Sequence, residues 1–182
     1  MNKAVFLDRD GVLNEDNGYT YMLSDLRILD GVIEGLRKIS SLGYKLIIVS
    51  NQSGIARGFF TLDQMHIFMQ GLINVLYKYD VEILDYYYCP HHIDGKIDEF
   101  TKSCSCRKPE PEMIIQAKKK YNLDLSRSIL IGDKETDIMA GRNASLYANI
   151  LVNAGGECIT SHANNVVKNL IAASEIIKGY QL

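Results

Sequence analysis

Short apolar runs alternate with longer amphipathic segments along the whole chain. Runs that end in polar loops predict buried strands at residues 3–8, 44–51, 81–89, 127–133 and 147–152. Segments with apolar residues at helical spacing predict helices at 31–43, 61–80, 111–122, 135–144 and 164–180. Thr61 is a suitable N-cap for the second of these helices, and Pro111 suits the first turn of the third.

The alternation of strands and helices indicates βαβ units with right-handed crossovers. We therefore expect an α/β protein with a mainly parallel, three-layer Rossmann-like fold and helices on both faces of the sheet. No linker, repeat or low-complexity tract interrupts the pattern, so we expect residues 1–182 to form a single domain. In such folds ligands bind at the carboxyl ends of the strands.

The composition and charge of the chain argue against nucleic acids and membranes as partners. Hydrophobic residues make up 47% and charged residues 23% of the 182 residues, as in ordinary soluble proteins. The net charge is −2 and no basic stripe stands out, so we expect no nucleic-acid partner. No apolar run reaches the length of a membrane span, and the first residues do not resemble a signal peptide. We expect a cytoplasmic protein with no membrane partner and, without a coiled-coil pattern, a monomer.

Polar side chains gather where the predicted strands end. The residues expected at this edge of the sheet are Asp8, Asp10, Ser50, Asn51, Arg107, Lys108, Asp133, Lys134 and Asp137. Carboxylates in one crevice repel each other and stay ionised together only when a cation joins them. Oxygen ligands with room for water and a phosphate oxygen suit Mg²⁺, while lysines and a hydroxyl suit a phosphoryl group.

Two carboxylates two residues apart can divide the work of phosphoryl transfer. One can attack phosphorus beside Mg²⁺ and form an aspartyl-phosphate. The other can protonate the leaving oxygen and then take a proton from water. Gly11 allows the loop that carries Asp8 and Asp10 to curl toward one substrate. Each motif alone is also typical of a solvated loop, a turn or a helix cap, so the prediction depends on their occurring together.

The stretches DRDGV, SNQ, RKP and GDKETD occur in this order and resemble the four motifs of the haloacid dehalogenase-like phosphatases, from about residue 5 to residue 152. The resemblance implies a haloacid dehalogenase-like fold with Asp8 as nucleophile and Asp10 as acid and base. It further implies that Ser50 binds phosphate and that Lys108 steadies the nucleophile and the phosphate. The Mg²⁺ ligands it implies are Asp8, Asp10 and Asp133.

Three of the four cysteines lie in a polar segment, residues 89–106, which we call the cysteine loop. Cys89 and His91 form one pair, and Cys104 and Cys106 form another after twelve residues. Three thiolates and an imidazole can complete a tetrahedral zinc site. The spacing is tighter than in zinc fingers, so a disulfide and free thiols both stay open, although a disulfide is disfavoured in the cytosol.

The pattern CxH…CxCRKPxP is similar to a zinc-bearing subgroup of these phosphatases, which contains heptose 1,7-bisphosphate phosphatases and histidinol-phosphate phosphatase domains. The resemblance implies Zn²⁺ on Cys89, His91, Cys104 and Cys106. It implies a sugar phosphate as the small-molecule partner, with the C7 phosphate of D-glycero-D-manno-heptose 1,7-bisphosphate hydrolysed during synthesis of nucleotide-activated heptose. The implied substrate-binding residues are Asp16, Asn17, Gly18, Tyr19, Ser50, Asn51, Gln52, Ser53, Arg107, Lys108 and Lys134.

Alternatives remain open at the level of the sequence. Histidinol-phosphate hydrolysis is the second enzymatic interpretation, and a zinc-stabilised binding protein without catalysis is a third. The segment between Asp10 and Ser50 is too short for a large mobile cap, so we expect a minimal cap. Arg57 could hold a second anionic group or be a surface charge. Glu112 stands where the family often has glycine, which would add negative charge near the phosphate. Cys158 is expected to be a buried or free thiol.

Overall fold

The computed structural model describes residues 2–155 and 161–180. A six-stranded sheet runs through its centre in the order β3-β2-β1-β4-β5-β6, and every pair of neighbouring strands is parallel. The strands are β1 (Ala4–Leu7), β2 (Lys45–Asn51), β3 (Ile83–Cys89), β4 (Ile129–Gly132), β5 (Ala148–Val152) and β6 (Asn165–Val167). The predicted three-layer α/β fold is confirmed.

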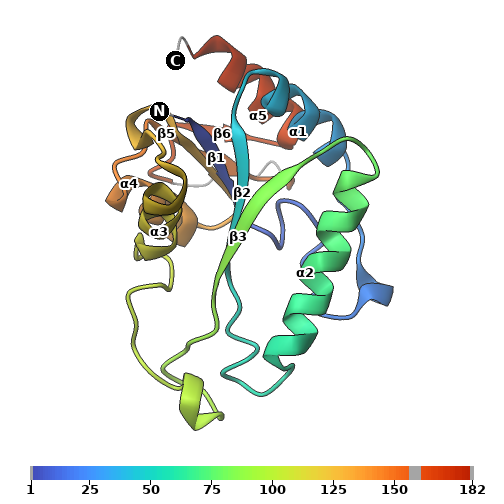
Figure 1. Cartoon of the computed structure of the whole chain (residues 1–182), viewed down its shortest axis with the longest axis vertical. Coiled ribbons are helices and arrows are strands. Elements are labelled where there is room, and N and C mark those ends of the chain that lie inside the picture. Colours follow the sequence, from blue (N-terminus) through green and yellow to red (C-terminus); the bar gives the residue numbers. More distant parts are fainter. Residues whose placement is uncertain (1, 156–160, 181–182) are drawn as a thin grey trace.

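Within the described residues, five α-helices cover the two faces of the sheet (Figure 1). They are α1 (Val32–Ser41), α2 (Leu62–Tyr77), α3 (Glu112–Tyr121), α4 (Glu135–Asn143) and α5 (Leu170–Gly179). Short 3-10 turns lie at Leu23–Asp25, Asp98–Phe100 and Leu125–Arg127. In the part of the chain that the structure describes, none of the helices is both long and apolar enough to cross a membrane.

Alternate side chains of the central strands build two separate cores. In β1, Val5 and Leu7 pack with the apolar faces of α1, α2 and α5, whereas Phe6 packs with those of α3 and α4. Strands buried on both faces must be apolar at nearly every position, which explains the continuous hydrophobic runs in the sequence. Helix α2 begins where predicted, with a capping box between Thr61 and Gln64.

The end of the chain differs from the prediction. Residues 164–180 were expected to form one helix, but Asn165–Val167 forms β6 on the edge of the sheet, beside β5. Helix α5 then begins after Asn169, whose side chain accepts a hydrogen bond from the amide of Ala172. A three-residue strand with an exposed Val166 is too short to produce a periodic signal of its own.

Two long segments extend beyond the carboxyl edge of the sheet (Figure 1). One follows β2 and leads to α2, and the other is the cysteine loop between β3 and α3. Together with the loops after β1 and β4 they surround the candidate site.

Candidate active site

A cavity of about 510 Å³ opens at the carboxyl ends of β1, β2 and β4. The residues that line it include all those predicted to contact substrate except Asn17: Asp16, Gly18, Tyr19, Ser50, Asn51, Gln52, Ser53, Arg107, Lys108 and Lys134. Asp8, Asp10 and Asp137 line it as well. Four segments far apart in the sequence therefore meet at one edge, because parallel strands all end on the same side.

Lys108 is buried at the base of the cavity between two carboxylates. Its Nζ lies 2.7 Å from Oδ1 of Asp8, 2.6 Å from Oδ1 of Asp137 and 2.8 Å from the carbonyl oxygen of Val49. Burial alone would lower the pKa of Lys108, but the charges of Asp137 and Asp8 outweigh it and raise the pKa above its usual value. The ammonium group therefore stays charged, and all three of its donors have acceptors.

The backbone of Lys108 is fixed as firmly as its side chain. The Asn51 side chain accepts a hydrogen bond from the amide of Lys108 at 3.0 Å and donates one to its carbonyl oxygen at 3.1 Å. The end of β2 thus anchors the segment that follows the cysteine loop. Next to Asn51, the buried Ser50 hydroxyl accepts a hydrogen bond from Gln52 Nε2 at 2.8 Å.

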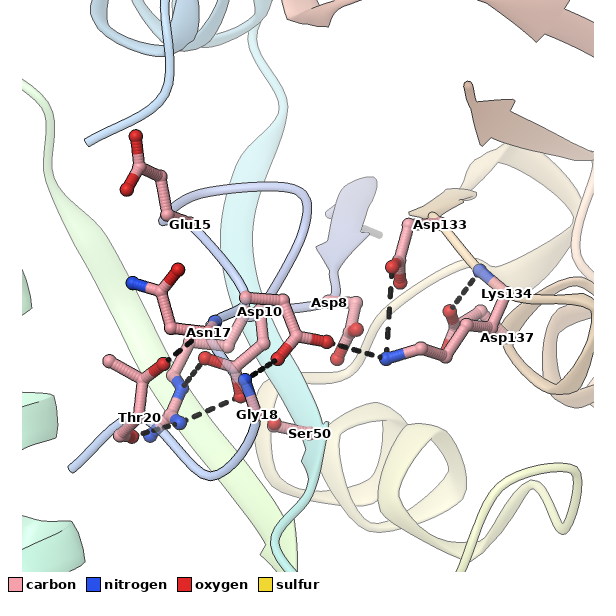
Figure 2. Close-up of polar contacts among 12 residues, drawn as sticks. Asp8, Asp10, Glu15, Asn17, Gly18, Thr20, Ser50, Asp133, Lys134 and Asp137 are labelled. Carbon is pink, nitrogen blue, oxygen red and sulfur yellow. Dashed lines mark hydrogen bonds and ion pairs between the residues drawn. The ribbon is translucent and has the colours of Figure 1, made fainter. Parts of the chain in front are cut away.

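Three carboxylates gather beside Lys108. Oxygen atoms of Asp8, Asp133 and Asp137 all lie within 4.8 Å of one another, and Figure 2 shows these residues on one side of the site. Oδ1 of Asp133 is buried without a hydrogen-bond partner. Gly11, with φ of 83°, lets the loop after β1 pass so close to Asp133 that any side chain there would clash. A hard divalent cation such as Mg²⁺ fits these donors, since they supply oxygen atoms with excess negative charge.

The carboxylate of Asp10 lies outside this cluster, on the side toward Thr20 (Figure 2). Arg9 holds it in a bidentate pair, with Nε 3.0 Å from Oδ1 and Nη2 2.7 Å from Oδ2. The side chains of Asn14 and Gln52 donate to the same carboxylate. The structure therefore does not bring the Asp10 carboxylate to the predicted Mg²⁺ ligands, because four donors hold it toward the neighbouring loop.

The loop at residues 15–20, here called the entrance loop, crosses the mouth of the cavity. On one side Asp16 forms an ion pair of 3.0 Å with Lys134, the residue before α4. On the other side the ring of Tyr19 packs against that of Phe59, with centroids 4.4 Å apart. Asn17 does not line the cavity; its backbone amide donates to the Thr20 hydroxyl instead. A short loop of this kind agrees with the predicted minimal cap.

The four predicted zinc ligands meet in the cysteine loop. The sulfur atoms of Cys89, Cys104 and Cys106 are 3.1–3.5 Å apart, and Nδ1 of His91 is 3.3 Å from Sγ of Cys106. Ligands at about 2.3 Å from a tetrahedral zinc ion stand about 3.8 Å apart, so the cluster is close to that geometry. None of these three cysteines forms a disulfide, which argues against the disulfide interpretation. A Cys₃His set is typical of closed structural zinc sites.

A family comparison identifies this arrangement. The sequence model of the haloacid dehalogenase-like hydrolases matches residues 6–145, which carry all the carboxylates described above. The chain belongs to this family of hydrolases.

Relatives of this hydrolase are similar over nearly their whole length. It is 42% identical to a D-glycero-beta-D-manno-heptose-1,7-bisphosphate 7-phosphatase of Haemophilus influenzae, over 98% of both chains. It is also 42% identical to a D-glycero-alpha-D-manno-heptose-1,7-bisphosphate 7-phosphatase of Photorhabdus laumondii, over 97% of both. A crystal structure of the D,D-heptose 1,7-bisphosphate phosphatase of B. bronchiseptica, complexed with magnesium and phosphate, shares 26% identity and a TM-score of 0.82, covering 97% of this chain and 98% of that one.

Arg57 and Glu112 of this hydrolase both lie apart from the cavity lining. Arg57 does not line the cavity; its guanidinium contacts the His92 ring, 3.1 Å from Nε2. Glu112 accepts a short hydrogen bond from Ser105 in the cysteine loop and lies away from the cavity lining. The negative charge of Glu112 therefore does not face the phosphate site. Cys158 lies outside the described residues.

Two residues of the site have a part that the sequence does not indicate. Asp137 is predicted at this edge of the sheet without a role of its own, and the structure adds its ion pair of 2.6 Å with Lys108. Arg9 stands between the two aspartates, but an arginine in a loop normally remains at the surface. Only the structure reveals that it is 1% exposed.

Without a bound divalent cation, the stability of this hydrolase should depend on pH. Burial and the charge of Asp8 raise the pKa of Asp133 from its usual 3.8 to about 7. Because the pKa is higher in the folded state, the contribution of Asp133 to stability is complete below 3.8 and is lost as the pH rises through 7. The ionisation of Asp133 should therefore make the metal-free protein melt at a lower temperature near pH 8 than near pH 5.5.

Mg²⁺ should reverse this trend, since it competes with the proton for the same oxygens. We expect Mg²⁺ to raise the melting temperature more at about pH 8 than at about pH 5.5, measured by calorimetry on chelator-treated protein. The side chain of the Asp133→Asn variant cannot ionise. In this variant Mg²⁺ should raise the melting temperature by the same amount at both pH values. If Mg²⁺ raised the melting temperature of the wild-type protein equally at both pH values, the assignment of this cluster as a Mg²⁺ site would be contradicted.

Proposed function

We propose that this hydrolase is a Mg²⁺-dependent phosphatase that removes the C7 phosphate from a D-glycero-D-manno-heptose 1,7-bisphosphate and leaves heptose 1-phosphate. The observation that carries the proposal is the buried Lys108 with Asp8 and Asp137 at the base of a cavity rich in hydrogen-bond donors. The named activities of relatives at 42% identity over nearly the whole chain support the substrate.

Asp8 is the proposed nucleophile. One of its carboxylate oxygens attacks phosphorus, the bond between phosphorus and the C7 oxygen breaks, and an aspartyl-phosphate forms. Asp10 gives a proton to the leaving C7 oxygen. Water then attacks the same phosphorus, Asp10 accepts its proton, and the bond from phosphorus to Asp8 breaks to release inorganic phosphate. Two protein residues thus complete the cycle and return to their starting state.

The remaining charges of the site hold the phosphoryl group. Lys108 Nζ stays within reach of the transferred oxygens because it is bound to Asp8, and the Ser50 hydroxyl lines the same wall. Asp8, Asp133 and Asp137 are the residues that would hold Mg²⁺, which when bound neutralises the charge of the carboxylates and of the phosphate. A Lys–Asp pair buried in this way would be costly without a chemical use, which disfavours a non-catalytic binding protein.

The cysteine loop would hold Zn²⁺ on Cys89, His91, Cys104 and Cys106. Four protein ligands leave no open position, so the ion would stabilise the loop and take no part in the reaction. The loop leads directly into Arg107 and Lys108, both of which line the cavity. The same proposal treats residues 1–182 as one domain of a cytoplasmic monomer that supplies a step in nucleotide-activated heptose synthesis.

A panel of substrates tests the proposed activity. We expect kcat/KM with both anomers of heptose 1,7-bisphosphate to exceed that with histidinol phosphate. The physical reason is that Arg107 offers an anionic second group a partner at the wall of the cavity, whereas histidinol carries a cationic one. Heptose 7-phosphate, which lacks the second phosphate, is the matched control. A higher kcat/KM with histidinol phosphate than with either heptose 1,7-bisphosphate would favour the alternative, histidinol-phosphate hydrolysis.

A further inference from the structure

Arg9 is among the largest fully buried side chains of the described structure, although arginine is rarely buried. It stands between Asp8 and Asp10 and is 1% exposed. Burying a guanidinium group is costly unless it is paired and hydrogen-bonded. The partners of Arg9 must therefore account for its place in the structure.

The pairing of Arg9 with Asp10 uses both oxygens of the carboxylate. Nε lies 3.0 Å from Oδ1 and Nη2 lies 2.7 Å from Oδ2, the parallel arrangement that fixes the plane of a carboxylate most firmly. Asn14 and Gln52 add donors at 2.9 and 3.2 Å. The side chain of Asp10 is 16% exposed and lines the cavity, so the restrained carboxylate still reaches the substrate space.

The guanidinium group also binds the entrance loop. Nη2, the nitrogen that donates to Asp10, donates to the carbonyl oxygen of Thr20 at 2.8 Å. Thr20 ends the loop in which Asp16, Gly18 and Tyr19 line the cavity. The guanidinium carbon also lies over the ring of Phe68 in α2, 4.7 Å from its centroid. Arg9 therefore connects a carboxylate of the site, the entrance loop and a core helix.

We propose that Arg9 is a positioning residue, which sets the orientation of the Asp10 carboxylate and ties it to the position of the entrance loop. The inference rests on the proposed function, in which Asp10 transfers a proton in both steps. Proton transfer requires the carboxylate within hydrogen-bond reach of the leaving oxygen. Thr20 holds Nη2 and Nη2 holds Asp10, so the position of the entrance loop affects the orientation of the acid/base.

The test compares two substrates whose leaving groups differ in their need for a proton. In the Arg9→Met variant we expect kcat for heptose 1,7-bisphosphate to fall about a hundredfold, the usual scale of general acid–base catalysis, while KM changes little. With p-nitrophenyl phosphate the leaving anion departs without a proton. Transfer to Asp8 should then stay fast and release of phosphate should become slow, giving a burst of one p-nitrophenolate per active site. Arg9→Lys keeps the charge but not the bidentate pair, so its kcat for heptose 1,7-bisphosphate should lie between those of the wild type and Arg9→Met.

Controls separate positioning from a general loss of structure. Arg37→Met removes an exposed arginine that pairs with Asp80 and should leave both substrates unaffected. If Arg9→Met melts below the assay temperature, Arg9→Lys carries the test. An equal loss with both substrates and no burst would overturn the proposal, because a structural role predicts that result. A wild-type protein inactive on both substrates would instead refute the proposed function.

Discussion

The Asp8→Asn variant should release no measurable phosphate. Asn is isosteric with Asp, so the hydrogen bond from Lys108 Nζ to the side-chain oxygen at 2.7 Å can persist, but the amide cannot attack phosphorus. Removing the nucleophile of a covalent mechanism typically costs about 10⁴-fold or more in kcat. Acid-quenched reactions with radiolabelled substrate should label the wild-type protein covalently and leave the variant unlabelled.

Asp80→Asn is a matched control for this experiment. Asp80 is exposed, has φ of 59° and pairs with Arg37, and Asn tolerates that backbone conformation well. Its activity should equal that of the wild type. Retained turnover in Asp8→Asn, with Mg²⁺ present and the fold intact, would rule out the covalent route. It would then require a water molecule, activated elsewhere in the cavity, as the nucleophile.

The order of the elements could be predicted because the strands of a parallel sheet covered on both faces appear in the sequence as continuous apolar runs. Strands such as β2, with Leu46, Ile47 and Ile48 fully buried, carry this signal strongly. Strand β6 is at the edge, and it merges in sequence with the first turn of α5. Edge strands contact the sheet on one side only, so their composition is less constrained.

The meeting of the candidate site residues followed from the same logic, whereas their orientations did not. The strand-end rule brings Asp8 and Lys108 together across a hundred positions of sequence without any information on side chains. The rule does not predict that the Asp10 carboxylate pairs with Arg9, or that Glu112 accepts a hydrogen bond from the cysteine loop. These choices depend on which donor lies nearest in space, and the donors come from loops whose paths have no periodic pattern.

We expect the Cys106→Ser variant to bind no zinc at the cysteine loop and to lose most of its activity. Cys106 is central to the cluster, 3.1 Å from Sγ of Cys89 and 3.3 Å from Nδ1 of His91, and it directly precedes Arg107 and Lys108. Elemental analysis should fall from about one zinc per chain to near zero. A displacement of Lys108 by about 1 Å costs on the order of a hundredfold in rate, and we expect kcat/KM to fall by up to that amount.

The loss should stop short of inactivation, because Lys108 has a second support. The two hydrogen bonds from Asn51 to its backbone, at 3.0 and 3.1 Å, do not pass through the metal. Asn51→Ala combined with Cys106→Ser should therefore lower kcat/KM by more than the product of the two single effects, since each support partly compensates for the loss of the other in holding the ammonium group near Asp8. Cys158→Ser, which removes the cysteine that is not among the four predicted zinc ligands, should bind zinc and keep its activity. If Cys106→Ser lost zinc but kept full activity, the cysteine loop would have no part in placing Lys108, and Asn51 alone would hold it there.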